Sequence, residues 1–148
     1  MNEKYMERAL ALAKTAAEKG EIPVGAVVVR DGEIIGEGYN RREELKSPSA
    51  HAEIIALEAA AKCLGDWRLS DCSLYVTLEP CPMCAGAIIN ARIKEVVFGA
   101  FDKRQGSASP DSVVNLFSLG FDQRVEVFGG IKETECKALL SEFFESKR

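Results

Sequence analysis

The chain has 148 residues, of which 47% are hydrophobic and 28% charged, and its formal net charge is −4. This length and composition fit one domain with a buried core and exclude global disorder. The apolar runs are only as long as strands, so the sequence predicts no membrane span. The acidic balance argues against binding nucleic acid through overall charge, and contact with phosphates would need a local basic patch.

The chain shows no internal repeat, low-complexity tract or linker, so we expect a single domain over residues 1–148. Its first ten residues, MNEKYMERAL, are charged and follow a helical pattern. They contain neither the apolar segment nor the small-residue cleavage site of a secretory signal, which predicts a cytoplasmic protein.

Hydrophobic periodicity predicts a helix over residues 2–19, followed by a compact β-branched strand over 24–29. The dipeptide Asp31-Gly32 favours a tight hairpin into a second strand over 33–39. We therefore expect these two strands to pair antiparallel.

The remaining sequence predicts three helices and three strands. In chain order these are helix 51–64, strand 73–78, helix 83–91, strands 95–101 and 124–128, and helix 131–146. The sequence leaves open whether a further helix forms between the last two strands. This order predicts one mixed sheet with helices on both faces.

The chain has five cysteines, an odd number, and two of them form a C-x-x-C motif. Because nothing indicates secretion, a disulfide framework is the weaker interpretation, and metal or redox chemistry is the stronger. Cys63, Cys72 and Cys136 lie in apolar patterns, and we expect them to be core residues.

Two short motifs, His51-Ala52-Glu53 and Pro80-Cys81-Pro82-Met83-Cys84, lie at predicted helix starts. Free N–H groups and the positive end of the helix dipole favour a thiolate there. Cys81 and Cys84 are three residues apart, so one helical turn points both sulfurs the same way. Together with His51 they make three zinc ligands and leave the fourth tetrahedral position for water, as in a catalytic site.

Glu53 is placed to take a proton from that water and to pass it to a departing nitrogen, without binding the metal itself. The alternatives are a structural zinc site, a redox pair, a core histidine and a helix-capping carboxylate. A structural zinc would require a fourth Cys or His, and His51 is the only histidine. The combination of these residues in this order therefore favours catalysis.

The order H-x-E…P-C-x-x-C is the known signature of zinc-dependent deaminases. The flanking sequence resembles that of bacterial tRNA-specific adenosine deaminases, a branch of the zinc-dependent cytidine/deoxycytidylate deaminase superfamily, over nearly the whole chain. The segments that carry this resemblance are 22–27, 36–40, 50–54, 74–87, 97–100 and 139–144.

The resemblance implies a cytidine-deaminase-like αβα sandwich with one mixed five-stranded sheet, assembled as a homodimer. It implies hydrolysis of a C–N bond, converting adenosine to inosine at the wobble position of a tRNA anticodon arm. One Zn²⁺ per chain would be bound by His51, Cys81 and Cys84, with no organic cofactor, and Glu53 would move protons. An anticodon loop is already single-stranded, so extruding its base costs little.

The same resemblance implies three substrate-binding residues. Asn40 would hydrogen-bond the extruded base, Ala52 would lie beside it, and Asp102 would contact the nucleotide backbone. For Asn40 the alternative is a turn residue after a strand, and for Asp102 a solvated loop carboxylate.

Two features depart from the family pattern. The segment 106–111 reads GSASPD, with an added residue in a loop expected to face the RNA or a partner subunit. The charges of the last helix cancel, which leaves Arg92, Lys94, Lys103 and Arg104 as the local basic cluster. This cluster is either a phosphate-binding patch or a solvated charged face.

Two other functions remain open. The first is a deaminase of a free nucleobase such as guanine or cytosine, which would use the same zinc site and suit the acidic charge. The second is a catalytically silent subunit that keeps zinc for structure, against which the presence of Glu53 argues.

Overall fold

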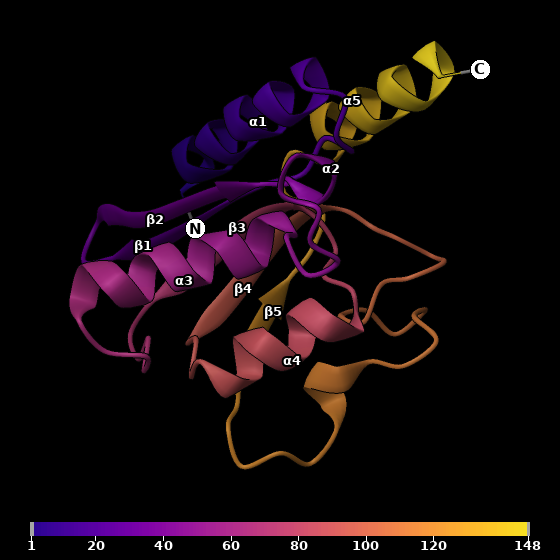
Figure 1. Cartoon of the computed structure of the whole chain (residues 1–148). Helices are drawn as coiled ribbons and strands as arrows, with labels where there is room; N and C mark the ends of the chain where they lie inside the picture. The colour runs from indigo at the N-terminus through magenta and orange to yellow at the C-terminus, as the bar shows by residue number, and fades with distance from the viewer. Residues whose placement is uncertain (1, 148) are drawn as a thin grey trace.

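The computed structural model describes residues 2–147 and contains one five-stranded sheet between two layers of helices (Figure 1). The strands are β1 (Gly25–Arg30), β2 (Glu33–Tyr39), β3 (Ser73–Leu78), β4 (Glu95–Ala100) and β5 (Glu126–Phe128), in the spatial order β2-β1-β3-β4-β5. β1 pairs antiparallel with β2 and β3, whereas β3–β4 and β4–β5 are parallel. The predicted mixed sheet and the cytidine-deaminase-like sandwich are therefore confirmed.

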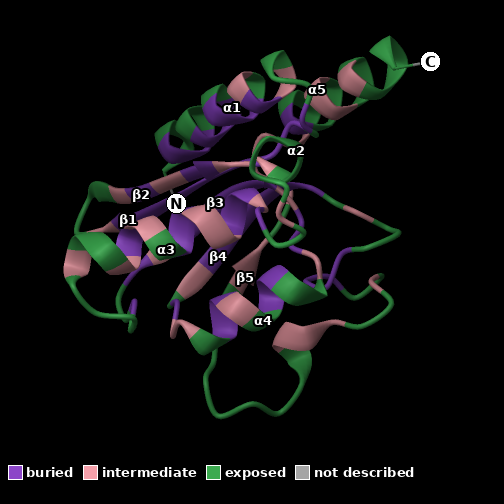
Figure 2. Ribbon diagram, viewed as in Figure 1, coloured by how far each residue is buried: buried purple, intermediate pink, exposed green. Residues whose placement is uncertain are grey.

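The helices pack on the two faces of this sheet. Helices α1 (Glu3–Glu18) and α5 (Glu133–Ser146) cover one face, and α3 (Ala52–Leu64) and α4 (Pro82–Asn90) cover the other (Figure 1). Strand side chains alternate between the two cores, so that Val27, Tyr75 and Val97 pack under α1 and α5. Burial follows this division, and the inward sides of the helices are the buried ones (Figure 2).

Each predicted helix and strand is present, with ends that differ from the prediction by at most two residues. The optional helix between the last two strands is only the short 3₁₀ helix η1 (Leu116–Ser118). Cys72 and Cys136 are buried as expected, but Cys63 is exposed, because it lies on the outer side of α3. The prediction that Cys63 is a core residue was wrong.

A short helix, α2 (Arg42–Leu45), was not predicted. The buried carboxylate of Glu21, 3% exposed, accepts hydrogen bonds from the backbone N–H groups of Glu43 and Glu44 at 3.2 and 2.9 Å. Glu21 thus supplies the acceptors that the first turn of this helix lacks. The side chain of Arg42 is held beside the cavity described below.

Helix α3 lies unusually close to β2. A Cβ built at Gly38 would lie 2.4 Å from the carbonyl oxygen of Ala52, and one at Gly36 equally close to that of Ala56. Only glycine permits this approach, which fixes the first turn of α3 against the sheet. None of the helices within residues 2–147 is long and apolar enough to cross a bilayer.

Candidate active site

The three predicted zinc ligands lie together where the N-termini of α3 and α4 meet. His51 caps α3, Cys81 caps α4, and Cys84 follows in the first turn of α4. The His51 Nδ1 atom is 3.6 Å from Cys81 Sγ and 3.4 Å from Cys84 Sγ, and the three ligand atoms lie within 4.8 Å of one another. The imidazole of His51 therefore turns Nδ1, rather than Nε2, toward the two cysteine sulfurs.

The chemistry of these donors fits a divalent cation. Hydrogen bonds from Cys84 and His51 lower the pKa of the Cys81 thiol to about 4. The same hydrogen bond to Cys81, together with burial, raises the pKa of Cys84. Side chains alone thus allow only one of the two thiols to ionise, whereas a cation would stabilise both thiolates. One nitrogen and two sulfur donors are the ligands that zinc prefers, and zinc is the cofactor of this site.

Glu53 lies in the first turn of α3, next to the donor cluster but outside it. Its side chain is buried, with 4% exposed, and lines the same cavity as His51 and Cys81. Burial raises the pKa of this carboxyl to about 7. A carboxyl group at this position can both accept and release a proton near neutral pH.

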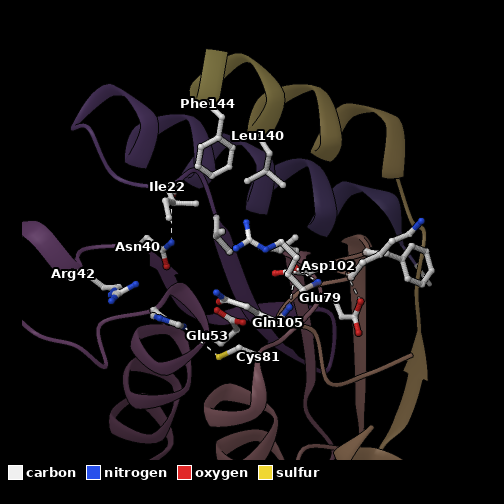
Figure 3. Close-up of a pocket in the computed structure, with 16 residues that line it drawn as sticks. Ile22, Asn40, Arg42, Glu53, Glu79, Cys81, Asp102, Gln105, Leu140 and Phe144 are labelled. Carbon is white, nitrogen blue, oxygen red and sulfur yellow. Dashed lines mark hydrogen bonds between the residues drawn. The ribbon is translucent and has the colours of Figure 1, made fainter. Parts of the chain in front are cut away.

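A cavity of about 410 Å³ opens over these residues (Figure 3). Leu140 and Phe144 of α5 point toward it from the side opposite Glu53 and Cys81 (Figure 3). Apolar walls are completed by Ile22, Val24 and Leu78. Exposed cationic side chains line its rim: Arg42, Lys103 and Arg104.

Asn40 also lines this cavity, and it is 8% exposed. Its Oδ1 accepts a hydrogen bond from the N–H of Ala52 at 2.9 Å, and its Nδ2 donates one to the carbonyl of Ile22 at 3.1 Å. One N–H of the amide remains free of these bonds. The N–H of Ala52 is occupied by Asn40, so Ala52 does not offer that donor to a ligand.

Asp102 lies in the loop after β4 and lines the cavity. Its Oδ1 accepts hydrogen bonds from the N–H groups of Arg104 and Gln105, both at 3.1 Å. Asp102 therefore shapes its own loop as well as facing the cavity.

Sequence analysis missed Glu79, which holds this loop in place. The Glu79 carboxylate, 3% exposed, accepts hydrogen bonds from the N–H groups of Asp102 and Ala108, each at 2.9 Å. A Cβ at Gly106 would lie 2.4 Å from Glu79 Oε2, so the loop wraps tightly around the carboxylate. A carboxylate that ends an otherwise apolar strand, directly before the Pro-Cys motif, was the clue in the sequence.

The predicted basic cluster is divided in the structure. Lys103 and Arg104 follow β4 and lie at the cavity, whereas Arg92 and Lys94 precede this strand. A strand of six residues spans about 20 Å, so the two pairs lie near opposite ends of β4. The prediction of a single four-residue patch was wrong, although two of its members do lie at the cavity.

Comparison with known proteins agrees with this site. Residues 1–100 match the family model described as the cytidine and deoxycytidylate deaminase zinc-binding region. The tRNA-specific adenosine deaminase of Bacillus subtilis (strain 168) is 48% identical over 148 residues, covering 99% of this chain and 91% of the relative.

Two solved structures similar to this chain represent the two candidate functions, editing of tRNA and deamination of a free base. One, from work on A-to-I editing by tRNA:A34 deaminases at the wobble position, superposes with a TM-score of 0.89 and 42% identity, covering 94% of this chain and 100% of the other. A guanine deaminase from Bacillus subtilis is 48% identical, but covers 68% of this chain and 66% of its own, with a TM-score of 0.65.

The sandwich fold, the His-Cys-Cys donor set and the adjacent carboxylate define a zinc-dependent deaminase, an enzyme that hydrolyses a C–N bond. Full-length identity and the closer superposition then place the chain within this class. It belongs to the tRNA-specific adenosine deaminase family.

Proposed function

We propose that this enzyme converts adenosine to inosine at the wobble position of a tRNA anticodon arm. The observation that carries the proposal is the cavity itself. Its floor combines two of the zinc donors, His51 and Cys81, with Glu53, and its rim carries the exposed cations Arg42, Lys103 and Arg104. A purine fits the interior, and the exposed cations suit the phosphates of an RNA strand despite the net charge of −4.

His51, Cys81 and Cys84 would hold the zinc ion, which when bound would lower the pKa of a water molecule and so make it a nucleophile near neutral pH. Glu53 performs the proton transfers. It accepts a proton from water as the new C–O bond forms at C6 of adenine, and delivers that proton to N1. It then takes the hydroxyl proton from the tetrahedral carbon and gives it to the amino group, so that the C–N bond breaks and ammonia leaves.

Asn40 and Asp102 orient the substrate in this proposal. The free N–H of the Asn40 amide donates to the extruded base, because the other polar atoms of this amide are fixed by Ala52 and Ile22. Asp102, which also lines the cavity, contacts the nucleotide backbone through Oδ2, because its Oδ1 already accepts hydrogen bonds from the N–H groups of Arg104 and Gln105.

The competing function is deamination of a free base such as guanine or cytosine. The cationic rim argues against it, because a neutral base has no phosphate for these side chains to bind. Guanine deaminase structures also superpose with lower TM-scores than the A34 deaminase structure.

A direct assay separates the two functions. The purified zinc enzyme is incubated with an anticodon stem-loop carrying a wobble adenosine and, in parallel, with free guanine, cytosine, adenine and cytidine. Inosine in the RNA is the expected product. Release of ammonia from a free base alone would overturn the proposal.

We further propose that the enzyme is a homodimer that acts in the cytoplasm. A surface groove between α3 and α4 is lined by Ile54, Leu57, Trp67 and Ala87, and Trp67 is 51% exposed. A second copy covering this groove would bury that apolar surface. Light scattering should give twice the 16.1 kDa of one chain.

A further inference from the structure

Glu21 is a buried carboxylate whose hydrogen-bond partners are backbone groups. It lies in the segment between α1 and β1, where its own N–H donates to the carbonyl of Ala16 at 2.9 Å. Its two carboxylate oxygens accept hydrogen bonds from the N–H groups of Glu43 and Glu44. Within residues 2–147 it forms no ion pair. Burying a carboxylate is costly, so its presence here indicates a role that an apolar side chain cannot perform.

Both hydrogen bonds support helix α2, which has little other support. All four of its residues are exposed to solvent. The side chain of Arg41, its N-cap residue, pairs with Glu44 rather than with the backbone of the helix. This pair and the pair between Lys19 and Glu44 lie at the surface, where ion pairs contribute little to stability. The carboxylate of Glu21 therefore provides the buried support for the first turn of α2.

Helix α2 brings one side chain to the active site. Of residues 42–45, Arg42 alone lines the cavity over the zinc donors, on the same side as Asn40 (Figure 3). Arg41 pairs with Glu44, whereas Arg42 forms no ion pair with any carboxylate of the described residues. The guanidinium of Arg42 is therefore free to bind an anion, and a phosphate of the RNA strand is the anion that arrives with the base.

We propose that Glu21 is a positioning residue, which acts through α2 to hold Arg42 where its guanidinium binds a phosphate of the RNA. The proposal rests on the RNA substrate proposed above, and Glu21 itself does not line the cavity. An arginine side chain has many conformations, and its hydrogen bonds to phosphate are directional. A fixed backbone at Arg42 therefore lowers the entropy lost on binding. Loss of the Glu21 carboxylate should weaken the binding of RNA and leave the chemical step intact.

The direction of the expected effect separates this role from simple electrostatics. Glu21→Gln removes a negative charge, so charge alone would strengthen the binding of RNA. The amide has the same shape but only one acceptor oxygen, and its NH2 group leaves one of the two backbone N–H groups without an acceptor. We expect KM for the stem-loop to rise about tenfold, with kcat and zinc content unchanged.

Steady-state kinetics of the zinc enzyme on the anticodon stem-loop, at several salt concentrations, test the proposal. Arg42→Ala should also raise KM about tenfold, and it should reduce the slope of log kcat/KM against the logarithm of the salt concentration by about 0.7, the value for one phosphate contact on a single strand. Glu21→Gln should reproduce both changes. The double variant should show no more loss than Arg42→Ala alone, because both substitutions remove the same interaction.

Two further variants complete the comparison. Glu21→Asp keeps both acceptor oxygens on a shorter side chain and should give a KM between those of the wild type and Glu21→Gln. Glu18→Gln is the matched control, because Glu18 is an exposed residue of α1 and the substitution removes the same charge. It should keep the wild-type KM.

Three results would overturn the proposal. The first is a loss of stability in Glu21→Gln with unchanged KM, which would make Glu21 a purely structural residue. The second is that the losses from Glu21→Gln and Arg42→Ala multiply in the double variant. The third is an unchanged KM in Arg42→Ala, a substitution that alters no buried residue. A wild-type enzyme that releases ammonia from a free base but forms no inosine in the stem-loop would instead refute the RNA substrate, and this proposal with it.

Discussion

The side-chain amide of Asn40, at the end of β2, joins this strand to the first turn of α3, because its Oδ1 accepts the hydrogen bond of the Ala52 N–H at 2.9 Å. Ala52 lies between His51 and Glu53 in the chain, so the same bond fixes the helix turn that carries a zinc donor and the proton-transferring carboxyl. Asn40 has both a structural role and the proposed contact with the base.

Asn40→Ala should lower the free energy of unfolding by about 1–3 kcal/mol, because the buried N–H of Ala52 loses its acceptor. Urea denaturation followed by circular dichroism measures this loss. Asn90→Ala, at an exposed position of α4, is the control and should change stability by no more than about 0.5 kcal/mol. Equal midpoints for the two variants would show that the Asn40 bond does not stabilise α3.

Local sequence was sufficient to predict the zinc donors. His51, Cys81 and Cys84 lie at helix starts that the periodicity already marked, and the geometry of a helix turn determines how neighbouring side chains point. The sequence could also have predicted that the basic residues lie in two separate pairs, because the strand predicted over 95–101 separates Lys94 from Lys103.

The positions of Glu21 and Glu79 could not be predicted in this way. Each accepts backbone hydrogen bonds from residues more than twenty positions further along the chain. The hydrophobic periodicity of a short sequence segment cannot predict such a bond, because the two partners come together only in the folded sheet and loops. The residues that hold the site together were therefore harder to find than the residues that carry its chemistry.

Removal of zinc should inactivate the enzyme and lower its Tm, because zinc binds only the folded arrangement of its three donors and its binding free energy is lost with the metal. Dialysis against a chelator tests this, and added Zn²⁺ should restore both properties. Cys84→Ala should retain less than half of the wild-type zinc content, measured by mass spectrometry of the metal. Cys63→Ala, at an exposed cysteine of α3, should keep about one zinc per chain.

Glu53→Gln should lower kcat on the stem-loop by about a hundredfold or more while zinc content stays near one per chain, because the amide keeps the shape of the side chain but transfers no proton. Quantifying inosine by mass spectrometry of the digested RNA gives the rate. Glu58→Gln, on an exposed position of the same helix, should retain wild-type kcat. An active Glu53→Gln enzyme would reject the proton-transfer role.

Gly106→Ala should displace the loop that carries Asp102, because the new Cβ would lie 2.4 Å from Glu79 Oε2. We expect KM for the stem-loop to rise about fivefold or more and the free energy of unfolding to fall by about 1–3 kcal/mol. Gly120→Ala is the matched control, since nothing lies within 4 Å of a Cβ at that position. Unchanged KM in Gly106→Ala would show that the Glu79 contact does not position the loop.

The ion pair between Arg8 and Glu37 predicts a small dependence of stability on pH. Arg8 Nε and Nη2 donate to the Glu37 carboxylate at 2.6 and 2.9 Å, and this hydrogen bonding holds the pKa of Glu37 below its usual range. A lowered carboxyl pKa in the folded state stabilises the protein above the pKa of the unfolded chain, and the gain disappears as pH falls through the folded value. Because both side chains are more than a third exposed, we expect at most about 0.5 kcal/mol at pH 7.

Urea denaturation of the wild type and Glu37→Gln between pH 7 and pH 3 measures this contribution. The variant should be slightly less stable at pH 7. The two curves should begin to converge near pH 4.5, where Glu37 of the unfolded chain takes up a proton, and should meet once Glu37 is protonated in the folded chain as well. Glu33→Gln serves as the control, because Glu33 is an exposed residue of the same strand and should show no such convergence. A difference between wild type and Glu37→Gln that grows toward low pH would contradict the assignment, since a protonated carboxyl cannot gain from the guanidinium.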